Sequence, residues 1–192
     1  MTGSRTARVW RVAGQAPSSS TSVDPQDDHE TIVRAQGGDR TAFDVIYRRY
    51  ARTVFGILLA RVPRADAEDL VQDVFVIALQ RLASLRDPAA LPGWLASIAR
   101  HRAIDHLRRS PLTAELPDGL TDGTADRTEA RAALDAIRTL PEAYRETLML
   151  RLVEGMTGPE IAARTGLTEG SVRVNLHRGM KLLRELLERR PA

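Results

Sequence analysis

The strongest constraint on the fold is a helical spacing of apolar residues that runs through most of the chain. From Glu30 to Arg109, and again from Thr128 onward, apolar side chains recur every three or four residues. Polar and apolar residues do not alternate over any run long enough for a strand, and no repeat of fixed period is found. The sequence therefore predicts an all-α protein.

Segments rich in Pro, Gly, Ser and Thr interrupt this pattern and divide the chain. Residues 1–28 lack an apolar period, and we expect a disordered N-terminal tail. Residues 110–127 are similar, and residues 110–129 carry five acids against one Arg, a net charge of −4. We expect a flexible acidic linker there, too short to form a domain. Two small helical domains are predicted beside it, at residues 29–109 and 128–190.

The composition excludes several classes of protein. Hydrophobic residues make up 43% of the 192 residues and aromatic residues 4%, so the core must be aliphatic. With no cysteine, the chain has no disulfide, thiolate metal site or cysteine nucleophile. No apolar run reaches the roughly 18 residues that cross a bilayer, and the N-terminus lacks a secretory signal. We expect a cytoplasmic protein.

Residues 66–82 are predicted to form a helix with two distinct faces. Asp66 is suited to the N-cap, and the acids that follow suit the helix dipole. A broad apolar face faces the core, and the opposite face carries Asp69, Gln72, Asp73, Val76 and Gln80.

A mixed set of side chains lies along the predicted helix at residues 94–109, "WLASIARHRAIDHLRR". A single stripe at helical spacing contains Trp94, Ser97, His101, Asp105 and Arg108, with Leu95, Ile98, Ala99, Ala103 and Leu107 on the other side. This stripe is compatible with a metal site, a catalytic site or a surface that binds nucleic acid.

Spacing and charge separate these alternatives. A metal site would need His101, Asp105 and His106, but residues at i and i+4 give two ligands and His106 points elsewhere. No Ser/His/Asp set or phosphate-binding Gly loop supports hydrolase chemistry. Residues 86–109 carry five Arg against two Asp, a net charge of +3, and a Trp on the stripe can stack on an unpaired base. These features favour binding of single-stranded nucleic acid.

Residues 157–181 have the layout of a helix-turn-helix. Thr157 and Glu160 form a capping box, Gly166 supplies a left-handed turn, and Thr168 caps the second helix. The free face of that helix presents Ser171, Arg173, Asn175, Arg178 and Lys181, which suit base edges and phosphates in a major groove.

Three segments of the sequence are specific when taken together: "DAEDLVQDVFVIAL", "GWLASIARHRAIDHLRR" and "LPEAYRETLMLRLVEGMTGPEIAARTGLTEGSVRVNLHRGMKLLRE". In order and spacing they resemble bacterial RNA polymerase sigma factors of the extracytoplasmic-function (ECF) class in the sigma-70 superfamily. The resemblance covers about residues 30–187. It implies that residues 29–109 are sigma domain 2, that residues 128–190 are sigma domain 4, and that the linker threads toward the polymerase active centre.

The resemblance also implies roles for individual residues. The core-binding helix at about 66–82 would contact the clamp coiled coil of the largest polymerase subunit through Asp69, Gln72, Asp73 and Val76. Recognition and melting of the −10 element would use Trp94, Arg100, His101, Asp105, Arg108 and Arg109. Recognition of the −35 element would use Ser171, Arg173, Asn175, Arg178 and Lys181.

The chain departs from the family pattern at a few of these positions. His101 stands where Asn is common, and Val174 and Asn175 replace small polar and basic residues, which bears on promoter specificity. The expected partners are core RNA polymerase, promoter DNA and an anti-sigma factor, with no cofactor and no enzymatic activity. Two rival functions are a free-standing helix-turn-helix regulator and a helical metalloenzyme.

Overall fold

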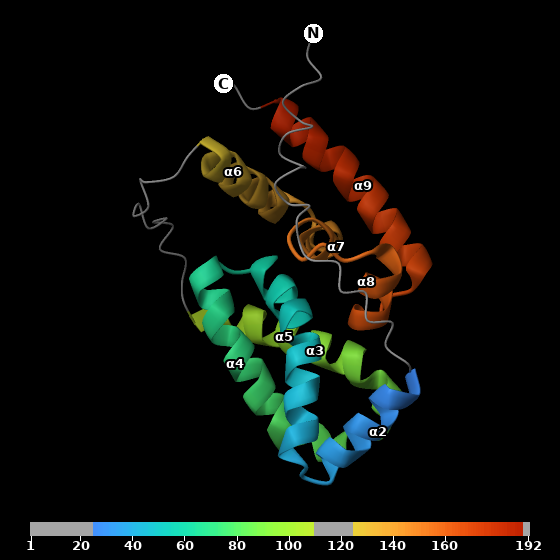
Figure 1. Ribbon diagram of the computed structural model, residues 1–192. Coiled ribbons are helices and arrows are strands. Elements are labelled where there is room, and N and C mark those ends of the chain that lie inside the picture. Colours follow the sequence, from blue (N-terminus) through green and yellow to red (C-terminus); the bar gives the residue numbers. More distant parts are fainter. Residues whose placement is uncertain (1–24, 110–124, 190–192) are drawn as a thin grey trace.

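The computed structural model describes residues 25–109 and 125–189, and every regular element in these ranges is a helix. The N-terminal half contains α2 (Pro25–Gln36), α3 (Arg40–Leu59), α4 (Arg64–Arg81) and α5 (Leu91–Arg109), with short 3-10 turns at Leu82–Ser84 and Pro88–Ala90. The C-terminal half contains α6 (Ala125–Thr139), α7 (Glu142–Leu152), α8 (Gly158–Thr165) and α9 (Glu169–Glu188). In Figure 1 the two halves lie one above the other. The all-α prediction is confirmed.

Three helix starts differ from the sequence prediction. Helix α2 begins at Pro25, inside the predicted tail, and α6 begins at Ala125, inside the predicted linker. Helix α4 begins at Arg64 with Pro63 at the cap position, so Asp66 lies in the first turn and is not the N-cap. A proline suits a helix start because its ring presets φ and it has no N–H to leave unpaired. The rest of the predicted tail and linker, residues 1–24 and 110–124, lies outside the described residues.

Helix α3 is the central element of the molecule, and a local motif fixes its start. Gly38 adopts a φ of 92°, and the Asp39 carboxylate then accepts hydrogen bonds from the backbone N–H groups of Thr41 and Ala42 at 2.9 and 3.1 Å. The Thr41 hydroxyl and the Arg34 guanidinium also donate to this carboxylate and hold its pKa well below the usual range. Helix α3 then packs on α2, α4 and α5.

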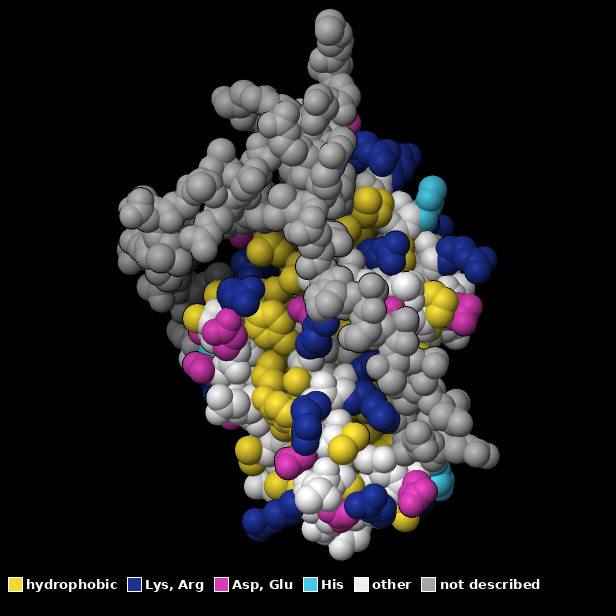
Figure 2. Space-filling view, viewed as in Figure 1, with side chains coloured by type: hydrophobic (Ala, Val, Ile, Leu, Met, Phe, Trp, Pro, Cys, Tyr) yellow, Lys and Arg dark blue, Asp and Glu magenta, His cyan; other side chains and the backbone are white. Residues whose placement is uncertain are grey.

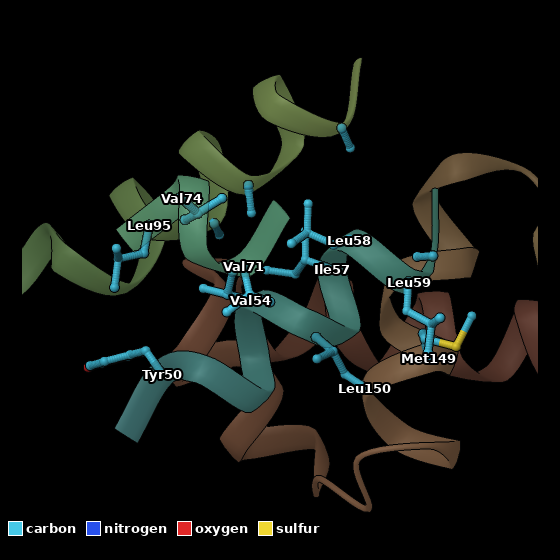
Figure 3. Packing of buried hydrophobic residues seen from close by; sticks show 14 of the residues in the cluster. Tyr50, Val54, Ile57, Leu58, Leu59, Val71, Val74, Leu95, Met149 and Leu150 are labelled. Atoms are coloured by element: carbon cyan, nitrogen blue, oxygen red, sulfur yellow. The ribbon is translucent and has the colours of Figure 1, made fainter. Parts of the chain in front are cut away.

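The hydrophobic core continues from one half into the other. The last turns of α3 are buried on all sides at Ile57, Leu58 and Leu59, because α4 and α5 cover one side and α7 covers another. Figure 3 labels Leu59 of α3 together with Met149 and Leu150 of α7, all of which belong to one cluster of buried residues. The two predicted domains therefore pack against each other through a shared core, which the sequence did not indicate.

The described surface carries positive charge on both halves and also exposes hydrophobic side chains. On the face shown in Figure 2, Lys and Arg side chains are spread over both halves and are not gathered into one patch. Within the described residues, no helix combines the length and the apolar character needed to cross a membrane.

Candidate nucleic-acid interface

One face of α4 is left open to solvent by the packing of the helix. Its opposite face, with Leu70, Val74 and Ala78, is buried against α3 and α5. The outer face carries the four residues that the sequence predicted to contact a partner, all of them exposed: Asp69, Gln72, Asp73 and Val76. Leu79 is also 54% exposed on this helix and extends the apolar part of the surface beside Val76. We refer to these five residues as the α4 face.

The α4 face is linked to α5 by an ion pair. Arg102 of α5 donates from Nη2 to the Asp73 carboxylate. Because Asp73 is half exposed, one side of its carboxylate remains open to solvent while the pair fixes its position.

Helix α5 presents the predicted stripe on the side that faces away from the core. Its inner side buries Leu95, Ala99 and Ala103. On the outer side His101 and Arg108 are exposed, while Trp94, Ser97 and Asp105 are half-buried, and the Trp94 ring packs partly against the core. Arg109, at the end of the helix, is exposed as well.

One residue of the predicted inner side of α5 does not reach the core. Leu107 is 37% exposed. Its neighbour His106 pairs with Asp66 in the first turn of α4. Leu107 therefore lies level with the N-terminal end of α4, at the edge of the core. Its neighbour Ile104 is exposed to the same extent, and the end of α5 is therefore partly apolar on its surface.

His101 is held in one orientation by its own helix. Its Nδ1 atom lies 2.8 Å from the backbone oxygen of Ser97. Because that oxygen only accepts hydrogen bonds, Nδ1 must carry the proton and donate. In the neutral ring, Nε2 is then a hydrogen-bond acceptor that points away from this contact.

The residues named for a metal site are not brought together. His106 lies against α4, where its Nε2 is 3.2 Å from an Asp66 carboxylate oxygen, and His101 faces solvent. Among the described residues, no group of three or more His, Asp or Glu side chains is placed to hold a metal ion.

Arg100 occupies a different position from the rest of the predicted −10 set. It lies at the edge of the stripe and reaches α7 of the other half, where it binds the carboxylate of Glu146 with two hydrogen bonds. Nε to Oε2 measures 3.0 Å and Nη2 to Oε1 measures 2.7 Å. Arg61 also donates to this carboxylate, from Nη2 to Oε2 at 2.9 Å.

This cluster balances a buried negative charge with two positive ones. Burial alone would raise the pKa of Glu146, but the hydrogen bonds and charges of Arg100 and Arg61 outweigh it, and the pKa is lowered from 4.5. The bond to Glu146 correspondingly raises the pKa of Arg100. Glu146 is therefore ionised at neutral pH, although its side chain is only 7% exposed.

The predicted helix-turn-helix is present in α8 and α9, with each expected local feature. Thr157 accepts from the N–H of Glu160, and Glu160 accepts from the N–H of Thr157 at 2.7 Å, which lowers the pKa of Glu160. Gly166 ends α8 with a φ of 74°. Thr168 caps α9 by accepting from the N–H of Ser171 at 3.1 Å. The capping box, turn and cap are thus confirmed.

Helix α9 buries one side and leaves the predicted reading residues outside. Val172 and Leu183 are fully buried. Ser171, Arg173, Arg178 and Lys181 are exposed and Asn175 is half-buried. Within the described part of the chain, no hydrogen bond or ion pair engages the side chains of Arg173, Arg178 or Lys181. These three cations are available to a partner.

The sequence reasoning missed Glu146 and Arg61. No local pattern in the sequence marks them, because Glu and Arg are ordinarily surface residues. Their burial is seen only in the structure, where Glu146–Leu150 of α7 are five successive buried residues.

Family models match both halves of the chain. The model for sigma-70 region 2 matches residues 46–111, and the model for sigma-70 region 4 matches residues 130–183. The first includes the α4 face and α5, and the second includes the helix-turn-helix.

Curated relatives match over the length that includes both halves. The chain is 35% identical over 166 residues to the RNA polymerase sigma factor CarQ of Myxococcus xanthus, covering 81% of this chain and 95% of CarQ. It is 32% identical over 174 residues to the ECF RNA polymerase sigma factor BldN of Streptomyces coelicolor, covering 82% of this chain and 65% of BldN. It spans only 44% of the probable sigma factor RfaY of Xanthomonas campestris, at 35% identity over 84% of this chain.

Solved structures share the fold. CnrH in complex with the cytosolic domain of CnrY matches with a TM-score of 0.60 and 26% identity, covering 84% of this chain and 97% of that one. The sigma factor RpoE of Bartonella quintana, in complex with the anti-sigma factor NepR, matches with a TM-score of 0.53 and 21% identity, covering 78% and 98%.

Proposed function

The chain belongs to the ECF class of RNA polymerase sigma factors in the sigma-70 family, and from this membership we propose that it binds core RNA polymerase and directs promoter-specific initiation of transcription. It would read the −10 and −35 elements and help to melt the −10 region. The rival function, a free-standing helix-turn-helix regulator, is not favoured, because the relatives match both halves of the chain.

We assign the two halves and their surfaces as follows. Residues 29–109 form sigma domain 2, and its α4 face contacts the clamp coiled coil of the largest polymerase subunit. Six residues of α5 contact melted −10 DNA: Trp94, Arg100, His101, Asp105, Arg108 and Arg109. Residues 128–190 form sigma domain 4, and α9 reads the −35 element. The linker between them threads toward the polymerase active centre.

One observation carries this proposal: a single chain combines a solvated acidic and apolar helix face, an aromatic and basic stripe, and a capped helix-turn-helix with free cations. Base stacking on Trp94 contributes about 1–3 kcal/mol per base and could offset part of the cost of unpairing. The cations of α9 suit duplex phosphates and guanine edges.

Further properties follow from this role. The protein would act as an initiation factor and not as an enzyme, because it would bind and position DNA while the polymerase performs the chemistry. It would need no cofactor. It would work in the cytoplasm, where polymerase and promoters are. An anti-sigma factor would be a further partner; the Bartonella quintana factor named above was solved in complex with the anti-sigma factor NepR.

The test is run-off transcription with purified core polymerase on a library of fragments from the genome that encodes this chain. We expect discrete transcripts that require both the chain and the polymerase, and their start points would define the promoters. Gel filtration of the chain with core polymerase gives an independent measure. No stable complex and no transcript would refute the proposed function.

A further inference from the structure

The cluster around Glu146 places two Arg side chains on one carboxylate, which is one cation more than its neutralisation requires. Arg61 and Arg100 both belong to the N-terminal half, whereas Glu146 comes from α7 of the other half. Arg61 is fixed by its own helix, because its Nη1 donates to the Ile57 carbonyl oxygen at 2.8 Å. The two guanidinium groups therefore converge on one anion, and removing α7 would leave both on the surface of the N-terminal half.

We propose that Arg61 and Arg100 form a binding site for a phosphate of the DNA backbone, and that Glu146 fills this site when the two halves are packed together. Guanidinium forks bind carboxylates and phosphates with the same paired geometry, so the Glu146 carboxylate stands in for a phosphate group. Arg61 thereby becomes an additional DNA contact, and Glu146 becomes the contact that closes the molecule. The assignment to DNA rests on the proposed function.

The rest of the boundary between the halves shows a close fit. Gly56 of α3 faces α7 so closely that a Cβ atom would lie 2.7 Å from Leu150 Cδ2. Gly166, in the helix-turn-helix turn, lies against Gly93 at the start of α5, where an added Cβ would be 3.0 Å from the Gly93 Cα. At Gly166 the contact is with backbone and φ is 74°, so this position requires glycine; at both positions the halves lie in close contact.

Ion pairs and cation contacts also join the two halves near these glycines. Arg52 donates from Nε to Glu154 Oε2 at 2.9 Å across the boundary, and Arg164 of α8 lies over the Tyr50 ring at 5.2 Å. Arg164 also donates to the Arg49 carbonyl oxygen. The closed arrangement thus engages a cation of the helix-turn-helix as well as Arg100 of the −10 set.

Size shows that the closed arrangement is incompatible with promoter binding. The −10 and −35 elements are about 25 base pairs apart, which at 3.4 Å each is roughly 85 Å. A compact chain of this length is only about 40 Å across. The two halves must therefore separate before both elements can be read, and separation frees Arg61 and Arg100 together.

The first measurement is the distance between the halves and does not depend on the function. The chain contains no cysteine, so spin labels can be placed only at two introduced ones, Arg48→Cys on α3 and Ala163→Cys on α8, both at exposed positions. We expect a short, narrow distance distribution in the free chain. Glu146→Gln should lengthen and broaden it with helix content preserved.

The matched control is Glu142→Gln. Glu142 sits on the same helix and also accepts from Arg61, at 2.8 Å, but it is 58% exposed. Its substitution changes the net charge equally and should leave the distance short. A second opening variant, Gly56→Leu, wedges α3 from α7 while Glu146 stays intact, and it should lengthen the distance too. A long distance in the unmodified background would overturn the closed state. A short one in both opening variants would overturn the role of Glu146 as the contact that closes the molecule.

The second measurement tests the phosphate site with single-stranded oligothymidylate of about 12 nucleotides, because phosphate contacts are independent of sequence. Because their two halves separate, Glu146→Gln and Gly56→Leu should bind the oligonucleotide about fivefold or more tightly than the unmodified chain. Glu142→Gln should not. Adding Arg61→Gln to Glu146→Gln should reverse most of this gain and reduce the salt dependence, whereas Arg64→Gln, an exposed neighbour, should do so far less.

The possible failures are distinguishable. If Arg61→Gln and Arg64→Gln weaken binding equally, Arg61 is not a phosphate contact and the proposed site is wrong. If opening occurs without tighter oligonucleotide binding, Glu146 does not compete with nucleic acid. If the unmodified chain does not bind core polymerase, the proposed function is refuted, and the distance measurements remain valid.

Discussion

At the scale of single residues, the surface side chains differ in whether a neighbouring residue fixes their position. His101 is oriented by Ser97 of its own helix, and Arg102 positions Asp73, whereas Arg173, Arg178 and Lys181 have no partner among the described residues. Spacing along a helix predicts the contact between Ser97 and His101, because residues three or four apart share a face whatever the rest of the fold does. It does not predict the pair between Arg102 and Asp73, which are 29 residues apart.

Trp94 gives the first prediction. Trp94→Ala should leave binding to core polymerase unchanged but slow promoter opening, seen as lost permanganate reactivity of unpaired thymines. The loss of one stacked base, worth about 1–3 kcal/mol, corresponds to roughly 5- to 150-fold.

Because the Trp94 ring also packs partly on the core, Trp94→Phe is the control. It keeps an aromatic ring at the site and should retain most of the opening activity. Normal opening by the alanine variant would remove Trp94 from the −10 surface.

At the scale of elements, the α4 face acts as a unit because one helix presents all five of its residues. Reversing charge with Asp69→Lys and Asp73→Lys should weaken core polymerase binding by roughly tenfold or more in a titration, since like charges would meet across the interface. The fold should persist, because both side chains are exposed.

Asp73 also pairs with Arg102, so the control is Arg102→Gln, which breaks the same pair and leaves the acidic face intact. It should bind the polymerase almost normally. Equal binding by the reversed and unmodified chains would exclude the α4 face as the contact surface.

The packing of α9 on α7 gives an element-scale prediction for stability. An added Cβ at Gly179 would lie 2.9 Å from Leu148 Cδ1 and 3.0 Å from Tyr144 Cβ, and the latter sits next to backbone that cannot yield. Overpacking costs about 1–3 kcal/mol. Most of this range lies above the roughly 1 kcal/mol that alanine gains in a helix, and the unyielding Tyr144 Cβ places the cost in its upper part. Gly179→Ala should therefore lower the free energy of unfolding in denaturant titrations.

Gly170→Ala, in the same helix, is the matched comparison. Its added Cβ would meet nothing closer than Thr168 Oγ1 at 4.0 Å. It should be neutral or stabilise the protein by up to about 1 kcal/mol. Destabilisation by both substitutions alike would contradict the packing argument.

At the scale of the whole molecule, the Glu146 cluster couples the closed arrangement to pH. The groups around this carboxylate are Arg61 from α3's end, Arg100 from α5 and Glu142 from α7. Because the pKa of Glu146 is lowered from 4.5 in the closed form, its contribution is present above 4.5 and is lost as pH falls through the lowered value. The distance between labels at positions 48 and 163 should lengthen in that acid window.

The variant chains show which carboxylate is responsible. Glu146→Gln should start with a long distance at neutral pH and change less on acidification, whereas Glu142→Gln should retain the acid transition. An identical acid transition in all three chains would assign it to other carboxylates.

The sequence by itself determined the helices, the capping box at Thr157, the turn at Gly166 and the outward stripes of α4, α5 and α9. These features arise from interactions over a few residues, which periodicity and capping chemistry record directly. Only the tertiary structure decided that the two halves share a core and that Glu146 of α7 joins Arg61 and Arg100. The physical reason is distance along the chain: these partners stand 85 and 46 residues from Glu146, and a carboxylate is ordinarily expected at the surface. Only the packing of α7 between α3 and α9 makes its burial possible, by placing two guanidinium groups within hydrogen-bonding distance.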